Sequence, residues 1–421
     1  MLIEFRVENH KSLRDEQVLT FEAGRGGDTT DTRPRQVEGY SESLLPAAVI
    51  YGANASGKSN MLSALTFMRD AVLNSHRRWE PVGGIPRTPF AWAGRRSASS
   101  MYEVTFVLDK TKYEYGFCVN DEVVEEEWLF AWPNHRRQMW FERDSGAFDF
   151  GENLKGPNAS VKEITRPNAL FLSAAAQNSH PLLTPLYSWF RSIFPYNISG
   201  RMNPLAAGRF MPDMLFATSE DQRSLFPIDP SEETLAERIR QLLRTADIGI
   251  VDVKRIVSEQ ELQGRKYRRQ RVLLQHQQDD EDSWLDLDEE SDGTKTLFQL
   301  APYVFKAIEA GGVVLVDELE SSLHPLIGLA IVKLFNCVKS NPKNAQMLFT
   351  THDTNLLGTT LGEPTLRRDQ IWFAEKDKEG ASKLFPLTDY KPRKAENLER
   401  GYLQGRYGAI PFLGDFIWSR E

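Results

Sequence analysis

The sequence predicts an α/β protein with a mixed central sheet, an antiparallel β subdomain and an inserted helical lobe. Three features lead to this prediction. An apolar strand at residues 47–51 runs into a glycine-rich loop and then into a helix with an apolar face. The stretch 101–149 alternates apolar and other side chains, as antiparallel strands do. Two later apolar strands, 313–316 and 347–350, are separated by a helical stretch, as strands of a largely parallel sheet are.

The length and composition favour a folded protein of two or three lobes. The chain has 421 residues and a formal net charge of −8, and domains average about 150 residues. The acidic balance argues against a protein that coats nucleic acid by bulk charge, although it leaves room for a local basic patch. No run of apolar residues is long enough for a transmembrane helix, and the first residues alternate rather than form a secretory leader. We expect a cytoplasmic protein without a membrane segment.

Cysteine usage excludes two further classes of protein. Only Cys118 and Cys337 are present, so the chain has neither a disulfide framework nor a zinc-ligand spacing. We expect both to be buried small hydrophobes in a reducing cytosol.

The first half of the chain begins with strands. Residues 2–8 alternate apolar and charged side chains, and residues 17–22 give a second strand candidate. A loop rich in Gly, Thr and Pro follows at 23–43. The fully apolar strand 47–51 is typical of the centre of a sheet that is covered on both faces. The helix after it presents four apolar side chains at helical spacing, Met61, Leu62, Leu65 and Met68.

The middle of the chain is expected to be mainly helical from residue 181 to residue 243. Its expected helices are Pro181–Phe194 and Ser231–Thr245. A basic run at 264–271 and an acidic run at 279–290 follow. These features divide the chain into an N-terminal lobe, an inserted helical lobe with a charged hairpin, and a C-terminal lobe, with bounds of 1–180, 181–290 and 291–421.

The C-terminal lobe alternates helices and strands. Helices are expected at about 293–310 and 325–340, around the strands 313–316 and 347–350. Residues 370–374 give the last strong strand candidate. The strands 313–316 and 347–350 would therefore be joined by a helix, as parallel neighbours require.

The loop after the first central strand has the spacing G-x-x-x-x-G-K-[ST]. Glycines at its ends allow consecutive backbone N–H groups to face one concavity and bind phosphate oxygens, at the positive end of the next helix. Lys58 would neutralise the β- and γ-phosphates of a nucleotide, and Ser59 would bind Mg²⁺. The predicted nucleotide-binding residues here are Gly52, Ala53, Asn54, Ala55, Ser56, Gly57, Lys58, Ser59 and Asn60.

A pair of carboxylates follows the apolar strand 313–316. Asp317 and Glu318 come directly after it, at the edge of an open α/β sheet where ligands bind. Asp317 fits a Mg²⁺ site through a bound water, and Glu318 fits the general base that polarises an attacking water. Together with the phosphate loop, they predict an ATP-hydrolysing site.

These motifs resemble the ABC-type ATPase head found in chromosome-maintenance (SMC) proteins, RecF and the OLD-family ATPases, within the wider AAA family. The segment 290–295 resembles the family's signature, with Ser291 and Gly293 at a helix start. The segment 321–325 resembles the D-loop, and 351–353 resembles the switch-histidine motif. The segment 172–178 ends an apolar run that is interpreted as a strand, and it would supply the Q-loop glutamine, Gln177. The signature departs from that of transporter heads, since it contains Asp292 and lacks their second glycine and glutamine.

The resemblance implies roles for these residues. ATP would lie between two protomers packed head to tail, in a homodimer or higher homo-oligomer. Ser291 and Gly293 of one protomer would cap the γ-phosphate that Lys58 of the other holds. His352 would sense that phosphate beside the catalytic residues Lys58 and Glu318. Mg²⁺ would be bound by three side chains, Ser59, Asp317 and Gln177.

The spacing of the motifs favours one branch of this class. Ser291 lies 233 residues after Lys58, much farther than in transporter heads, and no long heptad run fills the gap. The start at 2–13, the segment 318–325 and the tail at 401–411 resemble small ATPases of bacterial anti-phage modules. Those are RloA-like proteins, the AbiL ATPase and the ATPases of PARIS and Septu systems, which resemble sensors or scaffolds for a separate nuclease or toprim effector.

We found no nuclease motif within the chain itself. The seven histidines form no H-N-H constellation, and the D-x-D at 286–288 lies in an acidic run without an apolar strand before it. That run is interpreted as a solvated linker, and an effector protein encoded separately is expected. The tail at 401–411 would contact a partner or close the core.

The basic run leaves two interpretations open. It is either a hairpin that contacts DNA or a partner, or a solvated hairpin balanced by the acidic stretch after it. Its cations are Arg265, Lys266, Arg268, Arg269 and Arg271. Two functions therefore remain, a sensor or scaffold ATPase of an anti-phage module and a RecF-like DNA-repair ATPase that acts directly on DNA.

Overall fold

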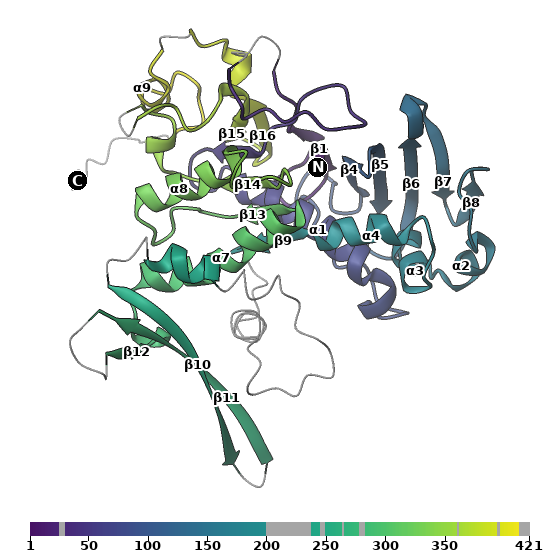
Figure 1. The fold of residues 1–421 in the computed structure, drawn as a ribbon. Helices are drawn as coiled ribbons and strands as arrows, with labels where there is room; N and C mark the ends of the chain where they lie inside the picture. The colour runs from purple at the N-terminus through teal and green to yellow at the C-terminus, as the bar shows by residue number, and fades with distance from the viewer. Residues whose placement is uncertain are drawn as a thin grey trace, which may run out of the picture.

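The computed structural model describes residues 1–24, 30–198, 237–244, 249–262, 265–277, 283–359, 362–393 and 396–411. Two sheets carry most of the fold, and a third, smaller sheet extends away from them (Figure 1). The predicted fold class is confirmed for the mixed central sheet and the antiparallel subdomain. Residues 199–236, most of the inserted helical lobe expected from residue 181, lie outside the described residues. Of the helix expected at Ser231–Thr245, the described part, 237–244, is helical.

The central sheet has six strands, of which five run parallel. Its order is β16 (Ser382–Pro386), β15 (Ile371–Lys376), β3 (Ala47–Tyr51), β14 (Gln346–Thr350), β13 (Val313–Val316) and β9 (Ile193–Tyr196). Strand β16 alone pairs antiparallel, with β15. The carboxyl ends of β3, β14, β13 and β9 therefore meet at one edge of the sheet.

The second sheet is antiparallel and has seven strands. Its order is β2 (Gln17–Thr20), β1 (Leu2–Glu8), β4 (Ser100–Leu108), β5 (Thr111–Val119), β6 (Val124–Trp132), β7 (Gln138–Asp144) and β8 (Ala147–Phe150). Strands β4 to β8 are joined in sequence, which confirms the antiparallel meander predicted for 101–149. Tyr102, Val104 and Phe106 point from β4 into the core and are fully buried.

Helix α1 (Lys58–Arg78) packs between the two sheets. Its apolar face shares one hydrophobic core with Ala48 and Ile50 of β3 and with the inner face of the antiparallel sheet. The alternate residues Ala47, Val49 and Tyr51 belong to a second core. Because successive side chains of a strand point to opposite faces, β3 is covered on both sides, as its unbroken apolar sequence predicts.

The second core is closed by the helices of the C-terminal lobe. Helix α7 (Asp292–Ala310) precedes β13, and α8 (Pro325–Asn336) joins β13 to β14. The tail forms α9 (Leu398–Leu403), where Tyr402 packs on Tyr51 and stacks on Phe373 with ring centroids 5.5 Å apart in each pair. The described part of the tail thus closes this core.

Smaller elements complete the two lobes. Helices α2 (Asn158–Ile164), α3 (Phe171–Gln177) and α4 (Thr184–Arg191) pack beside α1 and the antiparallel sheet (Figure 1). Short 3-10 helices span Pro133–His135, Leu287–Glu289, Thr354–Leu356, Arg368–Gln370 and Leu387–Tyr390.

The helix predicted at Pro181–Phe194 is wrong at both ends. The structure has α4 over Thr184–Arg191 and then places Ile193–Tyr196 in the central sheet as β9. Pro195 explains the change, because the residue before a proline avoids the helical region of backbone space. A proline is tolerated in β9, since that strand lies at the edge of the sheet.

The charged hairpin forms a separate three-stranded sheet. Strands β10 (Ile250–Leu262) and β11 (Arg265–His276) pair along their whole length and extend away from the central sheet, and β12 (Trp284–Asp286) pairs with the base of β11 (Figure 1). At this base, His276 bonds the buried carboxylate of Glu290 at 2.7 Å, directly before α7. The hairpin is therefore anchored at the start of α7.

The cysteine prediction holds for neither residue in full. Cys118 is partly buried on β5, and Cys337 is exposed at the end of α8. Cys337 ends its helix in extended conformation, which turns it away from the core side that Val332 and Phe335 occupy. Within the described residues, no helix has the length and apolar character needed to cross a membrane.

A buried histidine follows β1 and makes the stability of the fold depend on pH. Burial, with Lys11 nearby, lowers the pKa of His10 from 6.5 to about 3. Its ring bonds Tyr102 Oη at 2.9 Å and Ser63 Oγ at 3.2 Å. Because the unfolded chain binds this proton more readily, His10 favours the unfolded state as the pH falls from 6.5 toward 3.

We predict that His10→Gln makes unfolding less sensitive to acid. Its slope of unfolding free energy against pH between 6.5 and 4.5 should be smaller by up to about 1.4 kcal/mol per pH unit. Urea unfolding at several pH values measures this slope. The exposed His135 gives the matched control, His135→Gln, and equal slopes in both variants would contradict the assignment.

Candidate active site

The carboxyl ends of three parallel strands bring the phosphate loop, the paired carboxylates and His352 together. Strand β3 leads into the phosphate loop, β14 into Thr351 and His352, and β13 into Asp317. Strand β14 lies between β3 and β13 in the sheet. Residues that are far apart in the sequence thus line a single edge, where ligands of open α/β sheets bind.

The phosphate loop has the backbone that its sequence predicts. Gly57, at the start of α1, has a left-handed φ of 101°. A Cβ atom there would lie 2.1 Å from Ser382 Oγ, so the position requires glycine for both its conformation and its space. Ala55 also has a positive φ, 61°, a strained conformation for a residue with a side chain that the surrounding loop maintains.

Lys58 folds back over the loop. Its side chain is buried, and Nζ donates to the carbonyl oxygens of Gly52 at 2.8 Å and Ala53 at 3.0 Å. Burial lowers the pKa of the ammonium group, and the carboxylates of Asp317 and Glu318 act in the opposite direction. The positive charge of Lys58 therefore lies between the loop and the acidic end of β13.

A chain of hydroxyl and carboxylate groups connects the start of helix α1 with the ends of strands β13 and β14. Ser59 Oγ donates to Asp317 Oδ1 at 2.8 Å, and Thr350 Oγ1 donates to the same oxygen at 2.7 Å. Thr350 Oγ1 also accepts from the backbone N–H of Glu318 at 2.8 Å. Asp317 and Thr350 are both buried, so their positions are fixed by strands β13 and β14.

This arrangement fits a magnesium ion bound with a nucleotide. Ser59 and Asp317 offer a hydroxyl and a carboxylate oxygen within hydrogen-bond distance, which are the oxygen ligands that Mg²⁺ prefers. Among the described residues, no group of three His, Cys, Asp or Glu side chains would hold a metal ion. Because Mg²⁺ in such sites takes its other ligands from phosphates and water, two protein oxygens suffice. The ion would neutralise charge on the transferred phosphoryl group.

Glu318 stands at the open side of the same edge. It is exposed and has a left-handed φ of 53°. Its backbone N–H and that of Leu319 are bound by Thr350, through the hydroxyl and the carbonyl oxygen respectively. A carboxylate held by its backbone at the mouth of the site can accept a proton from a water molecule.

The predicted switch histidine lies beside these carboxylates. Glu320 Oε1 accepts a hydrogen bond from the backbone N–H of His352 at 2.5 Å, which ties the end of β14 to the segment after β13. Partial burial and the Lys58 ammonium group lower the pKa of the His352 imidazole. The neutral ring at pH 7 can therefore donate or accept a hydrogen bond.

The predicted signature begins helix α7, as expected. Ser291 is exposed, and its side chain accepts from Thr294 N at 3.1 Å as the N-cap. A Cβ atom on Gly293 would lie 2.9 Å from the carbonyl oxygen of Ser322, so glycine lets the helix start approach the D-loop segment closely. The two motifs therefore form one surface on the same protomer.

Gln177 is not brought to this edge. The apolar run before it forms helix α3 and not the predicted strand, and Gln177 Nε2 donates to Tyr187 Oη at 3.3 Å. Tyr187 in turn donates to the carbonyl of Leu73, which lies 15 residues beyond Lys58 on α1. Because a helix rises about 1.5 Å per residue, Leu73 lies well along α1 from its start, and Gln177 lies far from Ser59 and Asp317. The structure therefore does not support Gln177 as a third Mg²⁺ ligand beside them.

Asn197 instead occupies the end of a neighbouring strand. It follows β9, and its Nδ2 donates to the backbone oxygen of Asp317 at 3.2 Å. This residue is not among those predicted from the sequence, because residues 193–194 are assigned to a helix there. The Ile-Phe-Pro-Tyr sequence before it, rich in β-formers with a proline, is the signal that could have revealed it.

In the basic run of the charged hairpin, the structure describes the side-chain contact of one cation, Arg271. Arg271 is exposed, and its Nε donates to Asp286 at 2.6 Å. The predicted pairing of basic and acidic stretches therefore holds at this position. Asp286 also accepts from Asp288 N at 3.1 Å, so the D-x-D segment caps a short turn.

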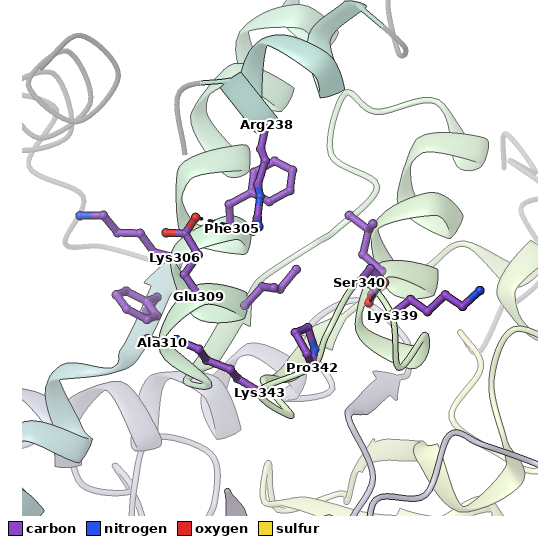
Figure 2. A pocket seen from close by; sticks show the side chains of 12 residues that line it. Arg238, Phe305, Lys306, Glu309, Ala310, Lys339, Ser340, Pro342 and Lys343 are labelled. Atoms are coloured by element: carbon purple, nitrogen blue, oxygen red, sulfur yellow. Dashed lines mark hydrogen bonds and ion pairs between the residues drawn. The ribbon is translucent and has the colours of Figure 1, made fainter. Parts of the chain in front are cut away.

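A separate cavity lies at the opposite edge of the central sheet. It has a volume of about 850 Å³. Figure 2 shows the side chains that line it, from the end of α7, the turn after α8 and the helical segment at 237–244. Arg238 pairs with Glu309 across it at 3.6 Å. It contains none of the predicted site residues, so the candidate active site is the strand edge described above.

The phosphate loop, the paired carboxylates after β13 and the signature at the start of α7 define an ABC-type ATPase head. A family model described as "AAA domain, putative AbiEii toxin, Type IV TA system" matches residues 47–358. The chain belongs to this AAA family, whose matched span includes all the site residues described here.

Comparison with solved structures gives distant matches. The SMC head domain from Thermotoga maritima is 14% identical with a TM-score of 0.39, covering 91% of this chain and 98% of that one. An SMC head bound to the C-terminal winged-helix domain of ScpA is 13% identical with a TM-score of 0.45, covering 92% and 99%. An SMC head from Pyrococcus furiosus with an extended coiled coil, also bound to ScpA, is 12% identical with a TM-score of 0.40, covering 93% and 97%. A search of curated proteins gave no match.

We predict that Thr350→Val weakens the binding of Mg²⁺ that ATP turnover requires. The change removes the hydroxyl that orients Asp317 and binds Glu318, a loss of about 1–2 kcal/mol. The Mg²⁺ concentration for half-maximal ATP turnover should rise roughly tenfold, as a magnesium titration would measure. Thr66→Val is the matched control, since its hydroxyl donates only to Leu62 within α1. Superimposable titrations of the two variants would contradict this role for Thr350.

Proposed function

We propose that this protein binds and hydrolyses ATP to ADP and phosphate. The observation that supports this most directly is the shared bond of Ser59 and Thr350 to one oxygen of Asp317. It joins the phosphate loop to the acidic strand end, so oxygen atoms of both would lie close to a Mg²⁺ ion bound with the nucleotide. In the proposed reaction, Lys58 and the loop N–H groups hold the phosphates. Glu318 accepts a proton from the attacking water.

The working unit in this proposal is a head-to-tail homodimer or a higher homo-oligomer. Ser291 is exposed at the N-terminus of a 19-residue helix, where N–H groups and the helix dipole favour an anion. The γ-phosphate held by Lys58 of one protomer would be capped by Ser291 and Gly293 of the next. ATP would then stabilise the assembly, and its hydrolysis would loosen it.

The biological role that we propose is that of a sensor or scaffold in a bacterial anti-phage module. Membership of a family named for a putative AbiEii toxin supports this role. The tail at 401–411 and the segment 318–325 support it as well, because they resemble those of anti-phage ATPases. The ATP-dependent assembly would hold or release a separate effector, a nuclease or toprim protein. The described tail packs against Tyr51, the last residue before the phosphate loop, so an effector bound there would lie close to the nucleotide.

The alternative is a RecF-like DNA-repair ATPase that acts directly on DNA. The basic run on β11 is the feature that favours it, through Arg265, Lys266, Arg268, Arg269 and Arg271. The net charge of −8 argues the other way. The pairing of Arg271 with Asp286 also reduces the charge that this hairpin offers to phosphates.

We predict that Glu318→Gln retains ATP binding, abolishes turnover and traps an ATP-bound dimer. The amide cannot accept the proton of the attacking water, so turnover should fall at least about a hundredfold. Phosphate release measures turnover, and size-exclusion chromatography with light scattering measures the dimer. Glu122→Gln, at an exposed turn of the antiparallel sheet, is the control. Hydrolysis by Glu318→Gln at the wild-type rate would show that Glu318 is not the base.

The effect of DNA on the ATPase rate distinguishes the scaffold function from the RecF-like alternative. If the protein is a scaffold, DNA alone should leave the ATPase rate of the isolated protein unchanged. Converting the five cations of the basic run to Ala should leave that rate unchanged as well. Gel shifts at several salt concentrations would measure any DNA binding. A matched control replaces five cations of the antiparallel subdomain, Lys110, Arg136, Arg137, Lys155 and Lys162. DNA-stimulated turnover that only the hairpin variant loses would favour the RecF-like alternative.

A further inference from the structure

A relay of hydrogen bonds, made by three side chains and the backbone carbonyl oxygen of Ser56, holds the phosphate loop from behind. Its members come from the turn after β1, from β16 and from both ends of the loop, and they are Ser12, Ser382, Ser56 and Asn60. We propose that Ser12 and Ser382 are positioning residues that preset the phosphate loop for ATP. This inference rests on the proposed ATPase function, although the relay itself is a feature of the fold.

The direction of each hydrogen bond in the relay follows from counting hydrogens. Ser382 Oγ lies 2.6 Å from the carbonyl oxygen of Ser56, which can only accept, so the hydroxyl of Ser382 must donate to it. That hydroxyl has a single hydrogen, so Ser12 Oγ, also 2.6 Å away, must donate to Ser382. Asn60 Nδ2 then donates to Ser12 Oγ at 2.6 Å. The relay therefore runs in one direction, from Asn60 through both serines to Ser56.

The relay encloses three of the residues that would contact phosphate. Ser56 precedes Gly57, Lys58 and Ser59, and Asn60 follows them in the first turn of α1. Ser382 donates to the carbonyl oxygen of Ser56 at one end, and Ser12 accepts from Asn60 at the other, so both ends of this segment are held. A hydrogen bond from the backbone N–H of Ser382 to the carbonyl of Ser12, 2.7 Å long, holds the two serines together.

The relay also explains why Gly57 tolerates no side chain. A Cβ atom there would lie 2.1 Å from Ser382 Oγ and 2.7 Å from Ser12 Oγ. The two hydroxyl groups thus occupy the space beside the loop backbone. Ser12 and Ser382 are 9% and 3% exposed, so water cannot readily replace either hydroxyl if it is removed.

If Ser12 and Ser382 had a purely structural role, replacing them would lower stability alone. A buried serine away from the loop, Ser100, provides the comparison. Ser100 is fully buried on β4, and its hydroxyl donates to the carbonyl of Asn9 at 2.6 Å. Its oxygen also accepts from Arg87 Nη1 at 3.1 Å, as Ser12 Oγ accepts from Asn60. Ser100→Ala therefore removes the same kinds of hydrogen bond near the end of β1, without any contact with the loop. The positioning role predicts that only Ser12→Ala and Ser382→Ala weaken ATP binding.

The experiment compares the three variants with the wild-type chain. Equilibrium titration with a fluorescent ATP analogue gives Kd, steady-state turnover gives kcat and KM, and thermal unfolding gives Tm. We expect Ser382→Ala to raise Kd and KM about three- to tenfold. Ser12→Ala should do the same to a smaller extent, because the bond from Ser382 to Ser56 remains. We expect a similar fall of Tm in all three variants.

The outcomes separate this inference from the proposed function. If Ser12→Ala and Ser382→Ala bind ATP as tightly as Ser100→Ala at matched Tm, the positioning role is wrong and the ATPase proposal stands. If the wild-type chain fails to bind the analogue, the proposed function fails and the inference fails with it. Should Ser382→Ala not fold, Ser12→Ala decides the question by itself.

Discussion

The hydrogen bond between Thr350 and Asp317 is the interaction on which the rest of the site depends. It joins β14 to β13 at the point where both strands end, and Ser59 adds the phosphate loop through the same carboxylate oxygen. The parallel pairing of β3, β14 and β13 makes this contact possible. If the register of β14 shifted by one residue, Thr350 would turn to the other face of the sheet and the three parts of the site would separate.

The parts of the fold that the sequence predicts well are those encoded by local pattern. The strand 47–51, the antiparallel meander and the start of α7 are found where their sequences place them. The paired carboxylates also follow β13 as expected. In each case a run of apolar residues ends at a polar or glycine-rich segment, so the element and its boundary are both visible in the sequence.

Errors occur where short segments have ambiguous patterns or where contacts are remote. The run before Gln177 is apolar and rich in alanine, and it forms a helix although its length also suits a strand. Strand β9 has only four residues, and its proline conceals it. Thr350, Asn197 and the pair Ser12 and Ser382 act through contacts between distant parts of the chain. Because no local periodicity encodes such contacts, only the tertiary structure reveals them.

The anchored hairpin has a mechanical consequence. Its strands are 13 and 12 residues long, and a strand rises about 3.4 Å per residue, so the hairpin is an arm of roughly 40 Å. Its base is held by the bond of His276 to Glu290, directly before the Ser291 cap of α7. A rotation of about 10° at that base displaces the far end by about 7 Å, by the geometry of a lever of this length. If α7 reoriented, this contact at its start would carry the change into a larger displacement at the far end of the hairpin.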